Sequence, residues 1–124
     1  DLEQSRRLRE LCDLALYAGN DDMLLDVLKI GGAGGICVAS HVAGDRMAEV
    51  VKLMRAGEVS RAEALTRELD PLYAALFATT NPILVKAALE LLGRPAGGLR
   101  PPLVAADREE RDTLAAELRR AGLL

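Results

Sequence analysis

The chain has 124 residues, of which half are apolar but only 2% aromatic, and it carries a formal charge of −3. The absence of a basic stripe and the scarcity of stacking aromatic residues argue against a nucleic-acid partner. No apolar run approaches the ~20 residues that cross a bilayer, so no membrane span is expected. The opening residues lack the apolar core of a secretory signal, and we expect a cytoplasmic protein.

The two cysteines, Cys12 and Cys37, are far apart and form no CxxC pair, and His41 is the only histidine. A zinc cage of cysteine and histidine ligands therefore cannot be assembled from this chain. The spacing instead predicts two reduced, buried thiols. We expect no metal site and no cofactor site in these residues.

Helical and extended patterns alternate in the first half of the chain. Leu2, Leu8 and Leu11 share one face of an amphipathic helix. Two short apolar runs, each closed by turn residues, predict buried strands, and each is followed by a helical pattern. The expected elements are a helix at 2–11, a strand at 14–19, a helix from 20 or 21 to 30, a strand at 34–40 and a helix from 44–45 to 57.

After Gly57 the pattern predicts helices only. A long amphipathic helix is expected over residues 58–80, with Pro71 marking a kink or a break. Pro82 suits the first position of the next helix. The proline- and glycine-rich residues 93–106 predict an extended connection, after which Asp107 caps a last helix.

The alternation in the first half predicts a parallel sheet with helical crossovers, so the expected fold class is α/β. Two strands alone would leave their outer edges unpaired. The chain also opens within a helical pattern rather than with Met. We therefore expect a fragment of an α/β barrel, divided into barrel residues 1–56 and helical residues 57–124. Missing strands of its own barrel, a second copy, or both would complete the sheet.

Four glycines between Gly31 and Gly35 invite comparison with a phosphate-binding loop. Such a loop follows a strand and opens a helix, so that the amides of the helix face the phosphate. Here a predicted helix precedes the glycines and a predicted strand follows them. The cluster therefore predicts a tight helix-to-strand turn.

In a barrel the active face lies at the carboxyl ends of the strands, which here are residues 18–21 and 39–41. Gly19 would let backbone approach a ligand closely, with an ordinary turn glycine as the alternative. Ser40 and His41 carry the groups of a nucleophile and a base, but adjacent residues at a strand end point in different directions. No acidic residue is evident to orient His41, so a structural role is favoured over catalysis.

Lysine is the other candidate nucleophile. A Schiff-base lysine needs a desolvated pocket at the active face. The three lysines, Lys29, Lys52 and Lys86, all fall on predicted helices away from the strand ends. No catalytic residue is therefore expected in this chain.

Four motifs follow one another in a distinctive order and spacing: YAGNDD, GGAGGICVASHVAGDRM, ATTNPILVKAALELLG and GGLRPPLVAADREERDTLAAELRRAGLL. In these motifs the chain resembles the C-terminal part of the dihydrodipicolinate synthase (4-hydroxy-tetrahydrodipicolinate synthase) family of the N-acetylneuraminate lyase superfamily. The resemblance covers essentially the whole chain. NPILVKAAL and GGLRPPLV are its most specific parts.

The resemblance implies strands seven and eight of a (β/α)8 TIM barrel with their flanking helices, followed by a three-helix C-terminal extension. It also implies a homotetrameric Schiff-base lyase of lysine and diaminopimelate biosynthesis that condenses pyruvate with aspartate semialdehyde. The family's catalytic lysine, its proton-relaying tyrosine and the arginine that holds the second substrate are expected upstream. The fragment alone is expected to be inactive.

Two substrate-binding positions carry over from the family. Gly19 matches the strand-seven glycine that lines the substrate pocket. Ile36 matches the strand-eight residue whose backbone carbonyl approaches the catalytic lysine and bound pyruvate. Asn20 departs from the family by replacing the first acid of its common G-D-D version.

Two other interpretations stay open. A sister pyruvate-dependent aldolase, acting on N-acetylneuraminate or a keto-deoxy sugar, shares the fold and the lysine, although VASHV at residues 38–42 favours the synthase. A non-catalytic helical module that binds a partner through its Leu/Ala faces would instead predict a self-sufficient helical bundle.

Overall fold

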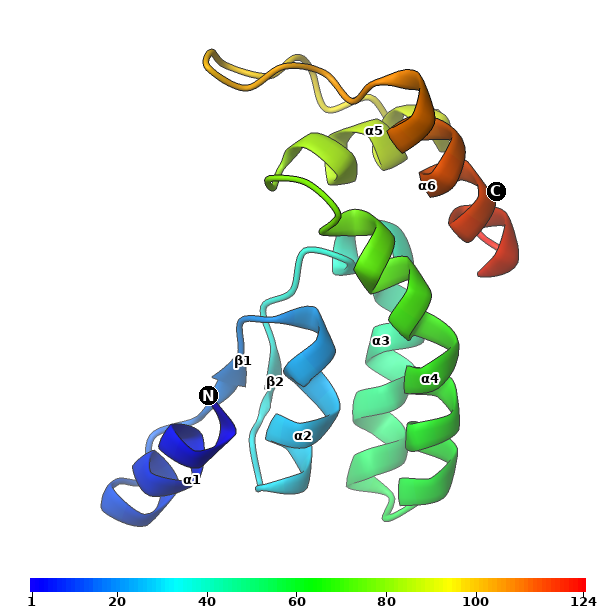
Figure 1. The fold of residues 1–124 in the computed structure, drawn as a ribbon. Coiled ribbons are helices and arrows are strands. Elements are labelled where there is room, and N and C mark those ends of the chain that lie inside the picture. The colour runs from blue at the N-terminus through cyan, green and yellow to red at the C-terminus, as the bar shows by residue number, and fades with distance from the viewer.

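The computed structural model of the chain describes residues 1–124 and is mostly helical, with two short strands (Figure 1). The elements in chain order are α1 (Leu2–Leu11), β1 (Tyr17–Ala18), the 3-10 helix η1 (Asp21–Met23), α2 (Leu24–Lys29), β2 (Gly34–Gly35), α3 (Ser40–Arg55), α4 (Val59–Leu76), α5 (Ile83–Leu91) and α6 (Arg108–Arg120). None of these helices is long and apolar enough to cross a membrane.

The two strands pair in parallel, as the alternation of elements predicted. Tyr17–Ala18 lies in register with Gly34–Gly35. One further hydrogen bond extends the pairing at each end: the N–H of Ala33 donates to the carbonyl of Leu16 at 2.7 Å, and the N–H of Ile36 donates to that of Ala18 at 2.8 Å. Both strands are shorter than predicted, because each has a partner on one side only and the rest of each apolar run has no ladder to join.

The strands are also less buried than their apolar runs predicted. α2 packs against both of them, and Ala18 and Cys37 are buried. Leu14, Tyr17 and Ile36 are exposed, Ile36 to 78%. The expectation of strands covered on both faces is therefore wrong within this chain, where helices cover only one side.

The glycine cluster forms the predicted helix-to-strand turn between α2 and β2. Gly31 has a φ of +85°, which glycine adopts without the strain that a Cβ would bring. A Cβ on Gly32 would lie only 2.4 Å from Cγ1 of Val27. Glycine therefore lets the turn pack directly against the end of α2.

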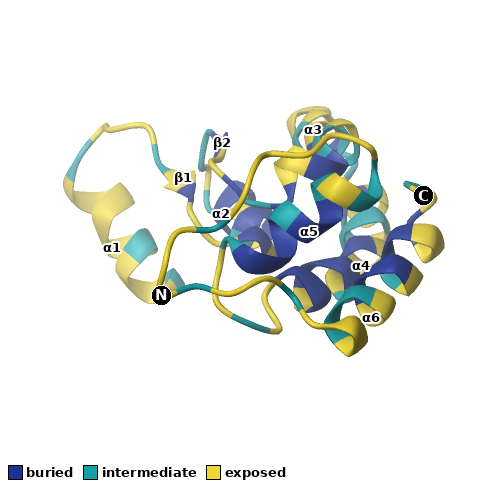
Figure 2. Cartoon of the chain, turned by 90° about the horizontal axis from the view of Figure 1, so that it is seen from above, coloured by how far each residue is buried: buried dark blue, intermediate teal, exposed yellow.

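A helical core holds most of the buried side chains. α3 and α4 run side by side, while α5 and α6 pack against each other and against this pair (Figure 1). Each of α2, α3, α4, α5 and α6 has buried residues, whereas no residue of α1 is buried (Figure 2). The leucines with at most 1% exposure are Leu69, Leu72, Leu76, Leu84, Leu114 and Leu118.

Several details of the helices differ from the predicted ones. α3 begins at Ser40, earlier than the predicted start at 44–45, and non-helical backbone at Ala43 separates its first turn from the rest. Pro71 lies inside α4 without ending it. Pro82 is the N-cap of α5 rather than its first residue.

The last helix and the segment before it agree with the prediction. Asp107 and Glu110 form a capping box in which each carboxylate accepts from the other residue's backbone N–H at 2.9 Å. The connection from α5 to α6 has no helix or strand. Lys86 anchors it, because its ammonium donates to the carbonyl oxygens of Gly97 at 3.3 Å and Gly98 at 2.6 Å.

Truncation of a core leucine tests this packing. Leu69 is fully buried on α4, so Leu69→Ala is expected to lower the free energy of unfolding of the chain by about 2–5 kcal/mol. Leu14→Ala is the matched control because Leu14 is 75% exposed, and it should change stability by only about 0.5 kcal/mol. Urea denaturation followed by circular dichroism measures both. Equal losses would contradict a core centred on α4.

Candidate functional site

The structure brings the two predicted site residues together. Gly19 directly follows β1 and Ile36 directly follows β2, so they are the next positions in the register that pairs Ala18 with Gly35. Both residues are exposed. We call residues 18–21 and 36–39 the strand-end edge, since they lie at the carboxyl ends of the two strands.

No contact within the chain requires glycine at position 19. A Cβ there would have no heavy atom within 4 Å, and the residue does not adopt the positive φ that favours glycine. The backbone geometry of an ordinary turn therefore gives no reason for this glycine. The space beside it is open.

Ser40 and His41 form no catalytic pair. Both lie in the first turn of α3 and are exposed. The Ser40 hydroxyl donates to the carbonyl of Cys37 at 2.5 Å, and His41 has no side-chain hydrogen bond to Ser40 or to any carboxylate. This arrangement agrees with a structural role for the segment.

The three lysines lie on helices, as predicted, with their ammonium groups bound elsewhere. Lys29 is 2.8 Å from Oε1 of Glu63, a contact that holds the pKa of that carboxyl below its ordinary value. Lys52 pairs with a glutamate of its own helix at 3.7 Å. Lys86 donates to Gly98. None of them contacts the strand-end edge.

A buried carboxylate lies within the strand-end edge, in the stretch 18–21 that the sequence predicts at the active face. Asp21 is the one buried charged residue of the chain, at 2% exposure. The N–H of Ala39 donates to its carboxylate, with both oxygens at 3.3 Å. Burial raises the pKa of Asp21, and the hydrogen bonds from Ala39 and the Cys37 thiol only partly offset that rise. Its position directly after a strand was the signal available in the sequence.

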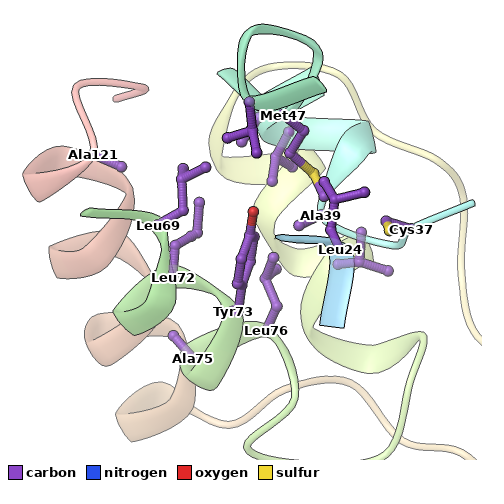
Figure 3. Close-up of a cluster of buried hydrophobic side chains, with 14 of the residues drawn as sticks. Leu24, Cys37, Ala39, Met47, Leu69, Leu72, Tyr73, Ala75, Leu76 and Ala121 are labelled. Atoms are coloured by element: carbon purple, nitrogen blue, oxygen red, sulfur yellow. The ribbon is translucent and has the colours of Figure 1, made fainter. Parts of the chain in front are cut away.

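Two neutral polar groups share the buried surroundings of Asp21. Burial and the nearby carboxylate raise the pKa of the Cys37 thiol to about 12. Burial and the same charge also raise the pKa of Tyr73, whose side chain projects from α4 into the middle of the apolar cluster (Figure 3). Both cysteines are free, but Cys12 is half-buried rather than buried as expected, because α1 buries none of its residues.

A hollow of about 560 Å³ opens beside the strand-end edge. Its lining residues come from the segment after β1 and from α4: Asn20, Asp21, Asp22, Asp70, Tyr73, Ala74 and Phe77. All the charged groups among them are acidic, so the hollow favours a cationic group over an anionic one. No group of three or more histidine, cysteine, aspartate or glutamate side chains is arranged to hold a metal ion.

The raised pKa of Asp21 predicts a specific pH dependence of stability. The folded chain binds a proton at Asp21 more tightly than the unfolded chain, so this residue's contribution to stability falls as pH rises from 3.8 through the raised value. Over that range we expect the free energy of unfolding of the wild type to fall relative to Asp21→Asn, which cannot ionise. Urea denaturation of both proteins, from below pH 3.8 to neutrality, measures the difference. A difference that does not vary with pH would contradict the assignment.

Comparison with known proteins identifies the family. The chain matches the model of the Dihydrodipicolinate synthetase family over residues 1–121. It is 48% identical to the 4-hydroxy-tetrahydrodipicolinate synthase of Moorella thermoacetica, an alignment that covers 100% of this chain and 43% of that protein. The chain therefore spans less than half the length of this relative.

The structure agrees with the sequence comparison. It aligns with the crystal structure of the synthase from Cyanidioschyzon merolae with lysine bound at a TM-score of 0.96 and 37% identity, covering 100% of this chain and 43% of that one. The synthase from Acinetobacter baumannii, complexed with pyruvate, aligns at a TM-score of 0.93 and 29% identity, with the same coverage. The two parallel strands and their helices are part of a TIM-barrel fold, and the chain belongs to the dihydrodipicolinate synthetase family.

Proposed function

We propose that the chain is the C-terminal part of a 4-hydroxy-tetrahydrodipicolinate synthase. Residues 1–56 supply strands seven and eight of a (β/α)8 barrel, and residues 57–124 supply the helical extension. The intact enzyme condenses pyruvate with aspartate semialdehyde through a Schiff base on a lysine outside this chain. The observation that carries the proposal is 48% identity to such a synthase along the full length of the chain.

In this enzyme, Gly19 and Ile36 line the pyruvate site through backbone and shape. Their adjacency at the carboxyl ends of parallel strands, where barrel enzymes bind substrates, supports the assignment. So does the open space beside Gly19, which no contact within the chain explains. The proposal places the acid–base chemistry of the reaction upstream of this chain.

The exposed apolar side chains support an upstream partner for the strands. Leu8, Leu11, Leu14, Tyr17 and Ile36 are between 45% and 78% exposed, and all belong to the first 36 residues. Preceding strands of a barrel would cover them and pair the open strand edges. The same edges count against a self-sufficient helical bundle.

The family resemblance extends the proposal to assembly and location. The intact protein would be a cytoplasmic homotetramer that needs no cofactor beyond its covalent pyruvate adduct. The relatives with solved structures include one with lysine bound and one complexed with pyruvate, ligands that fit an enzyme of lysine biosynthesis.

A chimera tests the proposed activity. In this chimera, the part of the Moorella thermoacetica synthase that matches this chain is replaced by the chain itself, and the upstream part of that synthase is kept. We expect borohydride to trap pyruvate on a lysine of the upstream segment. The condensation rate should stay within about tenfold of the parent enzyme, which corresponds to a change of ~1.4 kcal/mol in the activation free energy.

The isolated chain is the control for this experiment. Borohydride should leave no pyruvate adduct on Lys29, Lys52 or Lys86, because each ammonium is bound to other groups away from the strand-end edge. Peptide mass spectrometry locates any adduct. Label on one of these lysines, or a folded chimera that forms no Schiff base, would contradict the proposal.

Gly19→Ala tests the proposed lining of the pocket. The added Cβ meets no atom of this chain, so the stability of the chain should be unchanged or slightly raised. In the chimera, the methyl group would intrude on the substrate, and we expect KM for pyruvate to rise about tenfold. Gly98→Ala is the matched control, since its Cβ is equally uncrowded but lies in the connection before α6. An unchanged KM in Gly19→Ala would rule out this role.

A further inference from the structure

The hydrogen-bonded ladder between the two strand segments continues past the strands through a side chain. The last backbone bond runs from the N–H of Ile36 to the carbonyl of Ala18. Beyond this point the first segment leaves the sheet and enters η1, so its backbone no longer lies opposite the second segment. The N–H of Ala39 donates instead to the carboxylate of Asp21, with both oxygens at 3.3 Å.

Both ends of this contact are held firmly. Asp21 is 2% exposed, and its carbonyl accepts the N–H of Leu24 within the turn that opens α2. Ala39 is fully buried, and its carbonyl accepts the N–H groups of Val42 and Ala43, which start α3. The Asp21 carboxylate therefore connects the end of the first strand to the start of the helix that follows the second.

Ile36 has little other support. Its side chain is 78% exposed and therefore does not anchor it. The backbone bond to Ala18 fixes its N–H side, and the contact of Asp21 with Ala39 fixes the segment three residues further on. Without the Asp21 contact, the only hydrogen bond from residues 37–39 to the first strand segment would be the weak one from the Cys37 thiol to the carbonyl of Ala18 at 3.9 Å.

We propose that Asp21 is a positioning residue: by accepting the Ala39 N–H, it holds residues 36–39 beside Gly19 and so fixes the backbone that lines the pyruvate site. This inference rests on the proposed function, which places Gly19 and Ile36 at that site. Asp21 acts through the backbone it binds and not by contact with pyruvate. The role requires a hydrogen-bond acceptor of the right length and does not require a charge.

The difference between an acceptor and a charge gives the test. In the chimera, Asp21→Asn keeps an oxygen that can accept the Ala39 N–H, whereas Asp21→Ala removes it. We expect Asp21→Ala to raise KM for pyruvate about tenfold, the effect of losing one hydrogen bond, and Asp21→Asn to stay within about twofold of the wild type. KM for aspartate semialdehyde should not change in either variant. Asp26→Ala, at an exposed position of α2, is the matched control and should leave both constants unchanged.

Hydrogen exchange at the Ala39 amide measures the contact itself, whatever the activity. With the chimera shown to be folded by circular dichroism, this amide should be protected in the wild type and in Asp21→Asn, and should exchange faster in Asp21→Ala. Unchanged exchange in Asp21→Ala would overturn the contact. An equal rise of KM for pyruvate in the Asn and Ala variants, or no rise in the Ala variant, would overturn the positioning role. A wild-type chimera without a Schiff base would refute the proposed function, while exchange at Ala39 would still decide whether Asp21 holds the segment.

Discussion

A parallel ladder that is paired on only one side of each strand is the constraint on which the rest of the structure depends. Two strands of two residues cannot organise a core, since even longer isolated pairs are marginal in water. The helices must therefore stabilise the sheet. α2 covers one face of the strands, and the buried leucines of α4 and α5 hold α3 in place behind them. Each such leucine contributes about 1.5–3 kcal/mol through burial.

The same constraint determines how the strand-end edge is built. The ladder is short, and both segments soon turn into helices, the first into η1 at Asp21 and the second into α3 at Ser40. Backbone pairing cannot continue there, and a side chain replaces it. Asp21 is suited to this position since it is short and buried, and its oxygens can accept an N–H that has no carbonyl opposite. Burial raises the pKa of Asp21 by more than these hydrogen bonds lower it.

The sequence predicts local structure well where one or two residues determine it. The helix cap at Asp107, the turn at Gly31 and the parallel order of the strands are all of this kind. The length and burial of the strands were not predictable in the same way. The apolar run around Ile36 indicates a strand covered on both faces, whereas in this chain nothing covers that side chain.

The difference at Ile36 has a physical explanation in the proposed barrel. Exposed isoleucine and leucine beside an unpaired strand edge are unfavourable in water and become favourable once neighbouring strands cover them. The sequence pattern would then reflect the burial of these side chains in the longer protein. The structure shows only the burial that contacts within this chain provide. The burial of Asp21 and its contact with Ala39 were not predicted, for another reason. Periodicity identifies apolar faces, but the partner of a buried carboxylate lies 18 residues away and follows only from the fold.

In the proposed enzyme the chain contributes the shape of a site whose reactive groups lie elsewhere. A backbone segment can line a pocket only if other contacts hold it in place. Gly19 and Ile36 cannot provide such contacts themselves, because both residues are exposed. The helical core holds α3, α3 begins next to Ala39, and Asp21 ties Ala39 to the end of the first strand. Packing of leucines far from the substrate is thereby connected, through one carboxylate, to the position of the backbone beside pyruvate. A barrel that keeps its reactive side chains on other strands can in this way leave the alignment of one wall of its pocket to residues that perform no chemistry.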